Sequence, residues 1–258
     1  DWPISRQTAK RLTSNFSMDF SRFTTISFDC YGTLIDWEAG ILPVLRAVIA
    51  GHGKTLSDSK ILELYGEFEA EAERGAYQKY REVLRSVVRA FGERLGFNPT
   101  SFEIGSLSDS VPSWPPFSDT VPALQRLQTR FRLAIISNID DDLFAQTRKL
   151  LGVDFDAVIT AEQAGSYKPS LRNFEMAMES LKVRRERLLH VGQSIYHDVI
   201  PAQSLGLATV WVNRKSARPG VGAVRAAEST PDLEVADMAT LAEGALLQPY
   251  VIAALKVK

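Results

Sequence analysis

The chain has 258 residues, 45% of them hydrophobic and 24% charged, which excludes a disordered tail, a disulfide-stapled miniprotein and a fibrous repeat. Its 30 Lys and Arg residues nearly balance 31 Asp and Glu residues, and the net charge of −1 gives no global field for nucleic acid or an anionic membrane. The single cysteine, Cys30, excludes an internal disulfide, and no apolar run approaches the roughly 20 residues of a membrane span. We therefore expect a cytoplasmic protein.

The N-terminal region combines a polar leader with a first strand. Residues 1–17 mix charges with Ser, Thr and Asn, lack the apolar centre of a signal peptide and precede Met18. We expect a leader or expression tag over residues 1–20, with a basic, Ser-rich transit sequence as the alternative. The run FTTISFD over residues 23–29 is rich in β-formers, so it predicts a short buried strand that delivers Asp29 to a turn.

Helical patterns dominate the next segment. Over residues 37–116, apolar side chains recur at helical spacing with charges between them, which predicts a separate bundle of amphipathic helices. Asn98-Pro99 is predicted to end the helical run, and the Pro-rich stretch 111–116 to lead back to the core. Trp37 and Trp114 lie at the two boundaries of the bundle, where they either line a cleft or pack a hinge.

Helical and strand patterns then alternate. Alternation of this kind predicts an α/β fold with a doubly wound parallel sheet, in which sites gather at the carboxyl ends of the strands. The Gly- and Ala-containing stretch 216–227 is predicted to be an exposed loop. The predicted strands cover residues 131–137, 155–160, 187–192 and 207–213, and the predicted helices cover residues 119–129, 140–151, 170–181 and 196–205.

Two polar groups lie at the first two strand ends along the chain. Asp29 is a carboxylate on a tight turn, where it could act as a nucleophile that is esterified and later hydrolysed. The alternative is an Asp that merely caps the turn. Ser137 and Asn138 end the strand at 131–137, where a hydroxyl and an amide can bind an anionic group. Their alternative is an ordinary helix cap.

Two further groups follow later strands. Lys168 could pair with Asp29 and hold it ionised, although a lysine in a loop is usually solvated. Ser194 follows Gly192-Gln193 at the next strand end, and Asp198 lies four residues later. Asp198 could orient a water or complete an anionic site, or it could simply stabilise the dipole of the helix in its first turn.

Taken in this order, the four groups resemble the motifs of the haloacid dehalogenase superfamily, and DCYGTLIDWE is most similar to its 2-haloacid dehalogenase-like branch. The resemblance covers about residues 23–215. It implies a Rossmann-like core domain over residues 21–36 and 117–258, interrupted by an all-helical cap domain over residues 37–116. The active site is then expected between core and cap.

The same resemblance implies a role for each site residue. Asp29 is implied as the nucleophile, and Lys168 and Asp198 as the other catalytic residues. Ser137 and Asn138 are implied to meet the anionic part of the substrate. The full set of implied substrate-binding residues is Tyr31, Thr33, Ser137, Asn138 and Ser194.

Two departures from the superfamily pattern bear on the reaction. Phosphatases of the superfamily place a second Asp two residues after the nucleophile to protonate the leaving alkoxide, and here that residue is Tyr31. A halide leaves without a proton, so Tyr31 favours carbon–halogen displacement. The phosphatase-like fourth motif begins Gly-Asp, whereas Gln193 stands here, so Asp29 and Asp198 are the only obvious Mg²⁺ ligands. We expect no cofactor, with a weak Mg²⁺ site on these two carboxylates as the alternative.

The predicted cap domain also differs from the pattern of the 2-haloacid dehalogenases. The 2-haloacid dehalogenases use a cap Arg to assist the substrate carboxylate and halide, and Gly66 lies near that place here. Arg74 and Arg81 are nearby in sequence, and each is predicted to be a surface residue unless it reaches Asp29. The family's helper Tyr, six residues after the Lys, is Phe174 in this chain.

The histidines and the cysteine are predicted to stay outside the chemistry. His197 is next to Asp198, but adjacent residues on a helix point in different directions, so we expect no participation. His52 and His190 have no ligand spacing with each other or with Cys30, which predicts no zinc site. Cys30 follows the candidate nucleophile at a buried strand end and is predicted to be a packing residue.

The sequence therefore predicts a hydrolase in which Asp29 displaces halide from a small 2-haloacid through an aspartyl ester, giving a 2-hydroxy acid. The expected partner is a small anionic carboxylate, and apolar helical faces leave a homodimer open. One alternative is a Mg²⁺-dependent phosphatase of a small metabolite. Another is a degenerate, non-catalytic protein of the same fold that binds a ligand.

Overall fold

The computed structural model describes residues 18–214 and 227–246. Residues 1–17 of the leader predicted over residues 1–20 and nearly all of the predicted loop over residues 216–227 lie outside the described residues. Met18 and Phe20 are buried in the main hydrophobic cluster, so the core includes residues from the range that was predicted to be a leader. No helix in the described ranges is long and apolar enough to cross a membrane.

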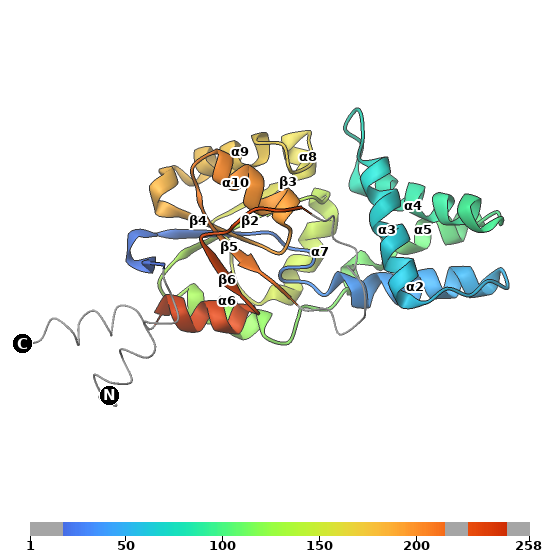
Figure 1. The fold of residues 1–258 in the computed structure, drawn as a ribbon, viewed down its shortest axis with the longest axis horizontal. Coiled ribbons are helices and arrows are strands. Elements are labelled where there is room, and N and C mark those ends of the chain that lie inside the picture. Colours follow the sequence, from blue (N-terminus) through green and yellow to red (C-terminus); the bar gives the residue numbers. More distant parts are fainter. Residues whose placement is uncertain (1–17, 215–226, 247–258) are drawn as a thin grey trace, which may run out of the picture.

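Six parallel strands form one sheet at the centre of the core (Figure 1). The strand order is β3-β2-β1-β4-β5-β6. The chain winds outward from β1 in one direction and then in the other, so the winding reverses between β1 and β4. This confirms the predicted doubly wound α/β fold. The strands are β1 (Thr25–Phe28), β2 (Arg132–Ser137), β3 (Ala157–Thr160), β4 (Leu188–Gly192), β5 (Ala208–Val212) and β6 (Leu233–Val235).

Helices cover both faces of the sheet (Figure 1). Successive residues of β2 point to opposite faces, so Leu133 and Ile135 join the cluster beneath α6 and α7, whereas Ala134 and Ile136 pack with α9 and α10. Strand β6 and a helix over residues 238–246 were not predicted. The core helices are α6 (Thr120–Leu127), α7 (Asp141–Leu151), α8 (Ala161–Ala164), α9 (Arg172–Leu181) and α10 (Ile200–Ser204), with short 3₁₀ turns η1 (Phe20–Arg22) and η3 (Arg185–Arg187).

A four-helix segment, α2 to α5, lies to one side of the sheet (Figure 1). Helix α4 ends at Leu95, with Gly96 as its left-handed C-cap, shortly before the predicted stop at Asn98-Pro99, but the helical run then resumes. Thr100 and Glu103 form a reciprocal capping box that starts α5. The bounds of these elements are α2 (Trp37–Gly51), α3 (Asp58–Ala72), α4 (Tyr80–Leu95), α5 (Ser101–Ser110) and the 3₁₀ turn η2 (Val111–Ser113).

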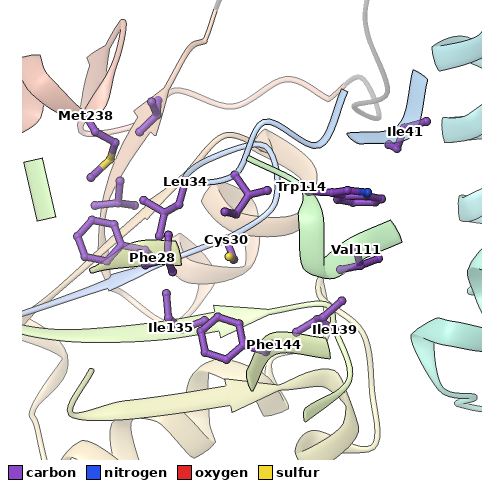
Figure 2. Packing of buried hydrophobic residues seen from close by; sticks show 14 of the residues in the cluster. Phe28, Cys30, Leu34, Ile41, Val111, Trp114, Ile135, Ile139, Phe144 and Met238 are labelled. Atoms are coloured by element: carbon purple, nitrogen blue, oxygen red, sulfur yellow. The ribbon is translucent and has the colours of Figure 1, made fainter. Parts of the chain in front are cut away.

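Hydrogen bonds and one tryptophan fix the four-helix segment to the core. The side chain of Asp140, at the start of α7, accepts from the backbone N–H groups of Tyr80 at 2.8 Å and Arg81 at 2.9 Å, and so caps the first turn of α4 from the core side. Trp114 is buried among core residues (Figure 2) and packs edge-on against Tyr31. Trp114 therefore packs the junction, as the hinge alternative expected, whereas Trp37 lines a cavity.

Candidate active site

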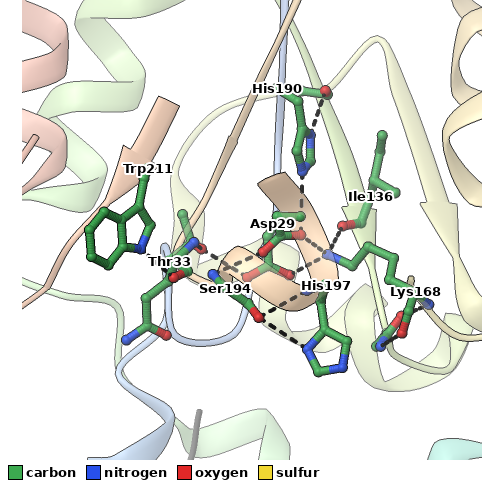
Figure 3. A network of polar contacts seen from close by, with 12 residues as sticks. Asp29, Thr33, Ile136, Lys168, His190, Ser194, His197 and Trp211 are labelled. Carbon is green, nitrogen blue, oxygen red and sulfur yellow. Dashed lines mark hydrogen bonds and ion pairs between the residues drawn. The ribbon is translucent and has the colours of Figure 1, made fainter. Parts of the chain in front are cut away.

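The carboxyl ends of β1, β2 and β4 meet around one buried ammonium. Lys168 Nζ donates to Asp29 Oδ1 at 2.8 Å, to Asp198 Oδ1 at 2.6 Å and to the carbonyl of Ile136 at 2.9 Å (Figure 3). The Lys168 side chain is only 1% exposed, so the solvated alternative for this lysine is wrong. All three hydrogens of the ammonium are used, which holds both carboxylates at fixed positions.

Asn138 explains why Lys168 lies there. Its Oδ1 accepts from the backbone N–H of Lys168 at 2.7 Å, and its Nδ2 donates to the Lys168 carbonyl at 3.2 Å. The amide of Asn138 is therefore engaged in holding the Lys168 loop. Ser137 differs, because its hydroxyl is buried, lines the cavity and has no hydrogen-bond partner. Of the two residues predicted to meet an anionic group, Ser137 is the one with a donor to offer.

Thr33 supports Asp29 from behind. Its hydroxyl donates to Asp29 Oδ2 at 2.8 Å and accepts from the backbone N–H of Gln193 at 2.8 Å. Thr33 is fully buried and does not line the cavity, so it orients the carboxylate rather than facing a ligand. The turn needs Gly32, whose φ is +92° and whose missing side chain leaves room for Gln193. Burial raises the pKa of Asp29, and the adjacent ammonium of Lys168 opposes that rise.

Asp198 lies on the other side of the ammonium. Besides Lys168, it accepts from the backbone N–H of Ser194 at 3.1 Å, and His190 Nε2 lies 3.3 Å from its Oδ1. Burial alone would raise the pKa of Asp198, but Lys168 and His190 together hold it well below its ordinary value. His190 is itself held by Ser27, 2.9 Å from Nδ1. His190 thus belongs to the hydrogen-bond network of Asp198. Within the described ranges, no cluster of three metal-ligating side chains occurs.

The helix predicted over residues 196–205 begins as a π-helix, η4 (Ile195–Val199), and continues as α10. Ser194 starts it by accepting from the backbone N–H of His197 at 3.0 Å. The wider turn brings the adjacent residues His197 and Asp198 to the same cavity. His197 therefore lines the same cavity as Asp198, although adjacent residues of a helix were expected to point in different directions. Ser194 Oγ lies 3.3 Å from Nδ1 of that imidazole, and Ser194 also lines the cavity.

Helix α3 closes the cavity, whose volume is about 60 Å³. Three residues of its inner face and its C-cap line the space in a repeat of small and acidic side chains: Gly66, Glu69, Ala70 and the C-cap Glu73. The spacing i, i+3, i+4 and i+7 puts these residues on one face of a helix. Sequence reasoning missed the two glutamates, although their spacing from Gly66 was the available signal. Aromatic residues of the same cavity are Tyr31, Trp37 and Tyr80.

The candidate arginines do not reach this cavity. Arg74 pairs with Glu71 on the surface of α3, and Arg81 pairs with Asp109 and Asp142. Neither arginine is among the cavity-lining residues. Tyr31 does line the cavity, with its hydroxyl 2.8 Å from Thr147 Oγ1.

On α3, the side chain of Glu69 is held in place by hydrogen bonds. Its Oε1 accepts from the hydroxyl of Tyr65 at 2.8 Å and from that of Tyr80, and the two tyrosine oxygens lie 2.9 Å apart. Burial raises the pKa of Glu69 and, together with the charge of Glu69, that of Glu73. The site therefore has an acidic wall facing the Asp29–Lys168–Asp198 group.

Comparison with known proteins places the chain among hydrolases. The model of the haloacid dehalogenase-like hydrolase family matches residues 23–206. An (S)-2-haloacid dehalogenase of Pseudomonas fluorescens is 27% identical over 197 residues, which cover 73% of this chain and 84% of the relative. A glyceraldehyde 3-phosphate phosphatase of Methanothermobacter thermautotrophicus is 29% identical over 201 residues, with the same two shares.

A solved structure extends the comparison to the fold. The L-2-haloacid dehalogenase of Xanthobacter autotrophicus, with chloropropionic acid covalently bound, superimposes with a TM-score of 0.72 at 21% identity. The match covers 85% of this chain and 97% of that structure. The two proteins share the arrangement of sheet and helices described above.

Proposed function

This chain belongs to the haloacid dehalogenase-like hydrolases, and we propose that it displaces halide from a small 2-haloacid with Asp29 as the nucleophile, giving a 2-hydroxy acid. The observation that carries the proposal is the setting of Asp29 beside a small cavity. Lys168 holds one of its oxygens and Thr33 the other. Relatives named as 2-haloacid dehalogenases support the choice of substrate.

In the first step, an oxygen of the Asp29 carboxylate attacks the carbon that bears the halogen. The carbon–halogen bond breaks, the halide leaves with the bonding electrons, and an ester forms between Asp29 and the substrate. The ammonium of Lys168 favours the ionised, nucleophilic form of Asp29. No general acid is needed, which agrees with Tyr31 at the position where phosphatases of the superfamily carry an acid.

In the second step, water attacks the carbonyl carbon of the ester. The bond from that carbon to the substrate oxygen breaks, which releases the 2-hydroxy acid and restores the Asp29 carboxylate. We assign one proton of the water to His197, whose imidazole lines the cavity and passes that proton to the leaving alkoxide, while the second proton of the water is released to solvent as the Asp29 carboxylate is restored. Lys168 stabilises the negative charge that develops on the carbonyl oxygen.

We further propose that the reaction needs no divalent metal. Mg²⁺ prefers several oxygen ligands, usually carboxylates with open lone pairs. Here the ammonium of Lys168 lies between Asp29 and Asp198, and Asp198 also accepts from the backbone of Ser194 and contacts His190. These residues do not fit a Mg²⁺ site, so we derive no step through a metal. With Tyr31 in place of the acid, the same geometry argues against the phosphatase alternative.

Chloride release from L-2-chloropropionate, measured with and without EDTA, tests this function. We expect release by the parent protein in the presence of EDTA and none by the Asp29→Asn variant. Asp142→Asn is the matched control, because this exposed aspartate pairs with Arg81 outside the cavity, and it should behave like the parent. Release only after Mg²⁺ is added would contradict the metal-free mechanism. No release at all would contradict the substrate class.

A further inference from the structure

The charges that line the cavity are not balanced. Among the described residues that line it, the carboxylates are Asp29, Asp198, Glu69 and Glu73, and Lys168 is the only lysine or arginine. All three hydrogens of the Lys168 ammonium are already donated to Asp29, to Asp198 and to a backbone carbonyl. The hydrogens of Lys168 are therefore all donated on the sheet side, so its charge lowers the pKa of Glu73 only through space, and the lysine has no hydrogen left to donate to the glutamates.

The two glutamates are arranged as a pair. They lie one helical turn apart on α3, and like charges at this spacing repel each other. The small residues Gly66 and Ala70 line the cavity beside them, which leaves room at this wall for a ligand. Burial raises the pKa of both carboxyl groups. A positive group placed between them would restore their ionised forms and remove the repulsion.

Hydrogen bonds hold Glu69 in an orientation that suits the binding of a positive group. Tyr65 and Tyr80 both donate to Oε1, so the carboxyl group is held in one orientation. Trp37 and Tyr31 also line the cavity, and aromatic rings attract cations through their faces. Carboxylates with aromatic side chains around them are a suitable environment for an ammonium group.

The sheet side of the cavity offers a hydrogen-bond donor instead of acceptors. Ser137 is 1% exposed, lines the cavity, and its hydroxyl has no partner. A buried hydroxyl without a partner can donate a hydrogen bond to a ligand, and a substrate carboxylate can accept it. The cavity thus has a donor at the end of β2 and acceptors on α3. One molecule with a carboxylate and an ammonium group satisfies both walls.

We propose that the preferred substrate is a 2-haloacid that also carries an ammonium group, with its carboxylate at Ser137 and its ammonium at Glu69 and Glu73. This inference rests on the proposed function and narrows its substrate class. Glu69 and Glu73 select the substrate and take no part in bond breaking. Halide displacement and ester hydrolysis proceed at Asp29 as described above.

Two isosteric substrates test the inference. 3-Amino-2-chloropropanoate and 2-chlorobutanoate differ only in an ammonium group that replaces a methyl group. Chloride release from each is measured with the parent protein, with an enzyme-free blank to subtract spontaneous release. We expect kcat/KM to be at least about tenfold higher for the amino compound, because hydrogen bonds to charged groups are the strong ones.

Variants of α3 then locate the effect. Glu69→Gln and Glu73→Gln should each lower the ratio of the two kcat/KM values by about tenfold. Glu67→Gln is the matched control, since Glu67 lies on the same helix and pairs with Arg94 outside this cavity, and it should keep the parent ratio. Glu73→Gln keeps the test valid if the loss of the tyrosine hydrogen bonds at Glu69 impairs folding.

The outcomes separate this inference from the function on which it rests. Equal kcat/KM values for the two compounds, or a ratio unchanged in both glutamine variants, would overturn the ammonium preference while leaving the dehalogenase function intact. Chloride release from neither compound, nor from chloroacetate, would overturn the function and the inference together.

Discussion

Lys168 Nζ lies 2.8 Å from Asp29 Oδ1, and the two residues are 139 positions apart in the chain. The contact joins the end of β1 to the loop that follows α8, and Asn138 holds that loop by both ends of its amide. Because the pair is buried, the charge of Asp29 depends on the ammonium beside it. The chemistry that we propose for Asp29 therefore depends on a residue that the sheet topology brings to it.

The pH dependence of the reaction should report this environment. The ionised form of Asp29 is the nucleophile, so kcat/KM should fall as the pH drops through its pKa, which burial raises above the ordinary value. Thr33→Val removes a hydrogen bond that lowers this pKa. We expect the acid limb of the kcat/KM profile to move to higher pH by up to about one unit. An acid limb at the same pH in both proteins would contradict this assignment.

Ester hydrolysis should depend on His197 more than ester formation does. In His197→Gln, the first turnover should release halide at nearly the parent rate, while steady turnover slows by about 10²-fold or more because the water loses its base. A halide burst equal to the enzyme concentration would show this in rapid-mixing experiments. His52→Gln is the matched control, as His52 contacts Glu103 at 3.2 Å, away from the cavity. Equal slowing of both steps would argue against the role.

Ser137 should contribute to substrate binding. Ser137→Ala removes the unpartnered hydroxyl and should raise KM for 2-haloacids by about tenfold while changing kcat less. Initial rates of halide release over a range of substrate concentrations would measure both parameters. Ser113→Ala, which changes an exposed serine in η2, should leave both parameters as they are. An unaltered KM in Ser137→Ala would show that the carboxylate binds elsewhere.

Asp198 should couple stability to pH. Its pKa is depressed in the folded protein, so its contribution to the free energy of unfolding is complete above about pH 4, the ordinary value for Asp, and is lost as the pH falls further. Asp198→Asn should lower the free energy of unfolding at pH 7 by about 3 kcal/mol or more, because a buried charge loses its partner. Urea unfolding at pH 7 and at lower pH would measure this. A variant as stable as the parent would contradict it.

Much of the core could be predicted because its signals are local. A strand of β-formers followed by a polar residue places that residue at a sheet edge, so Asp29, Ser137 and Lys168 were expected near one another. The structure places all three around one cavity, and their catalytic roles stay predictions. The burial of Lys168 was not predictable, because it depends on contacts with Asp198 and a carbonyl that are distant in the sequence.

Other features depend on packing that no local pattern reports. The π-helix η4 has no characteristic spacing of apolar residues, so it could not be predicted. It places His197 in the same cavity as Asp198, which the spacing of an α-helix did not predict. Helix α3 was visible from its apolar spacing, but which of its polar residues face the cavity depends on how the four-helix segment packs against the core. Glu69 and Glu73 were therefore not predicted as site residues, and Arg74 was considered in their place.

The central claim is that Asp29 forms a covalent ester with the substrate. A single turnover with excess enzyme, L-2-chloropropionate and H₂¹⁸O, followed by mass spectrometry of the peptide containing Asp29 and of the product, tests it directly. Our account predicts ¹⁸O in the carboxylate of Asp29 and unlabelled oxygen in the hydroxyl group of the 2-hydroxy acid, because that oxygen comes from Asp29. Product labelled with ¹⁸O and an unlabelled Asp29 would show that water attacks the substrate directly, and would contradict the account.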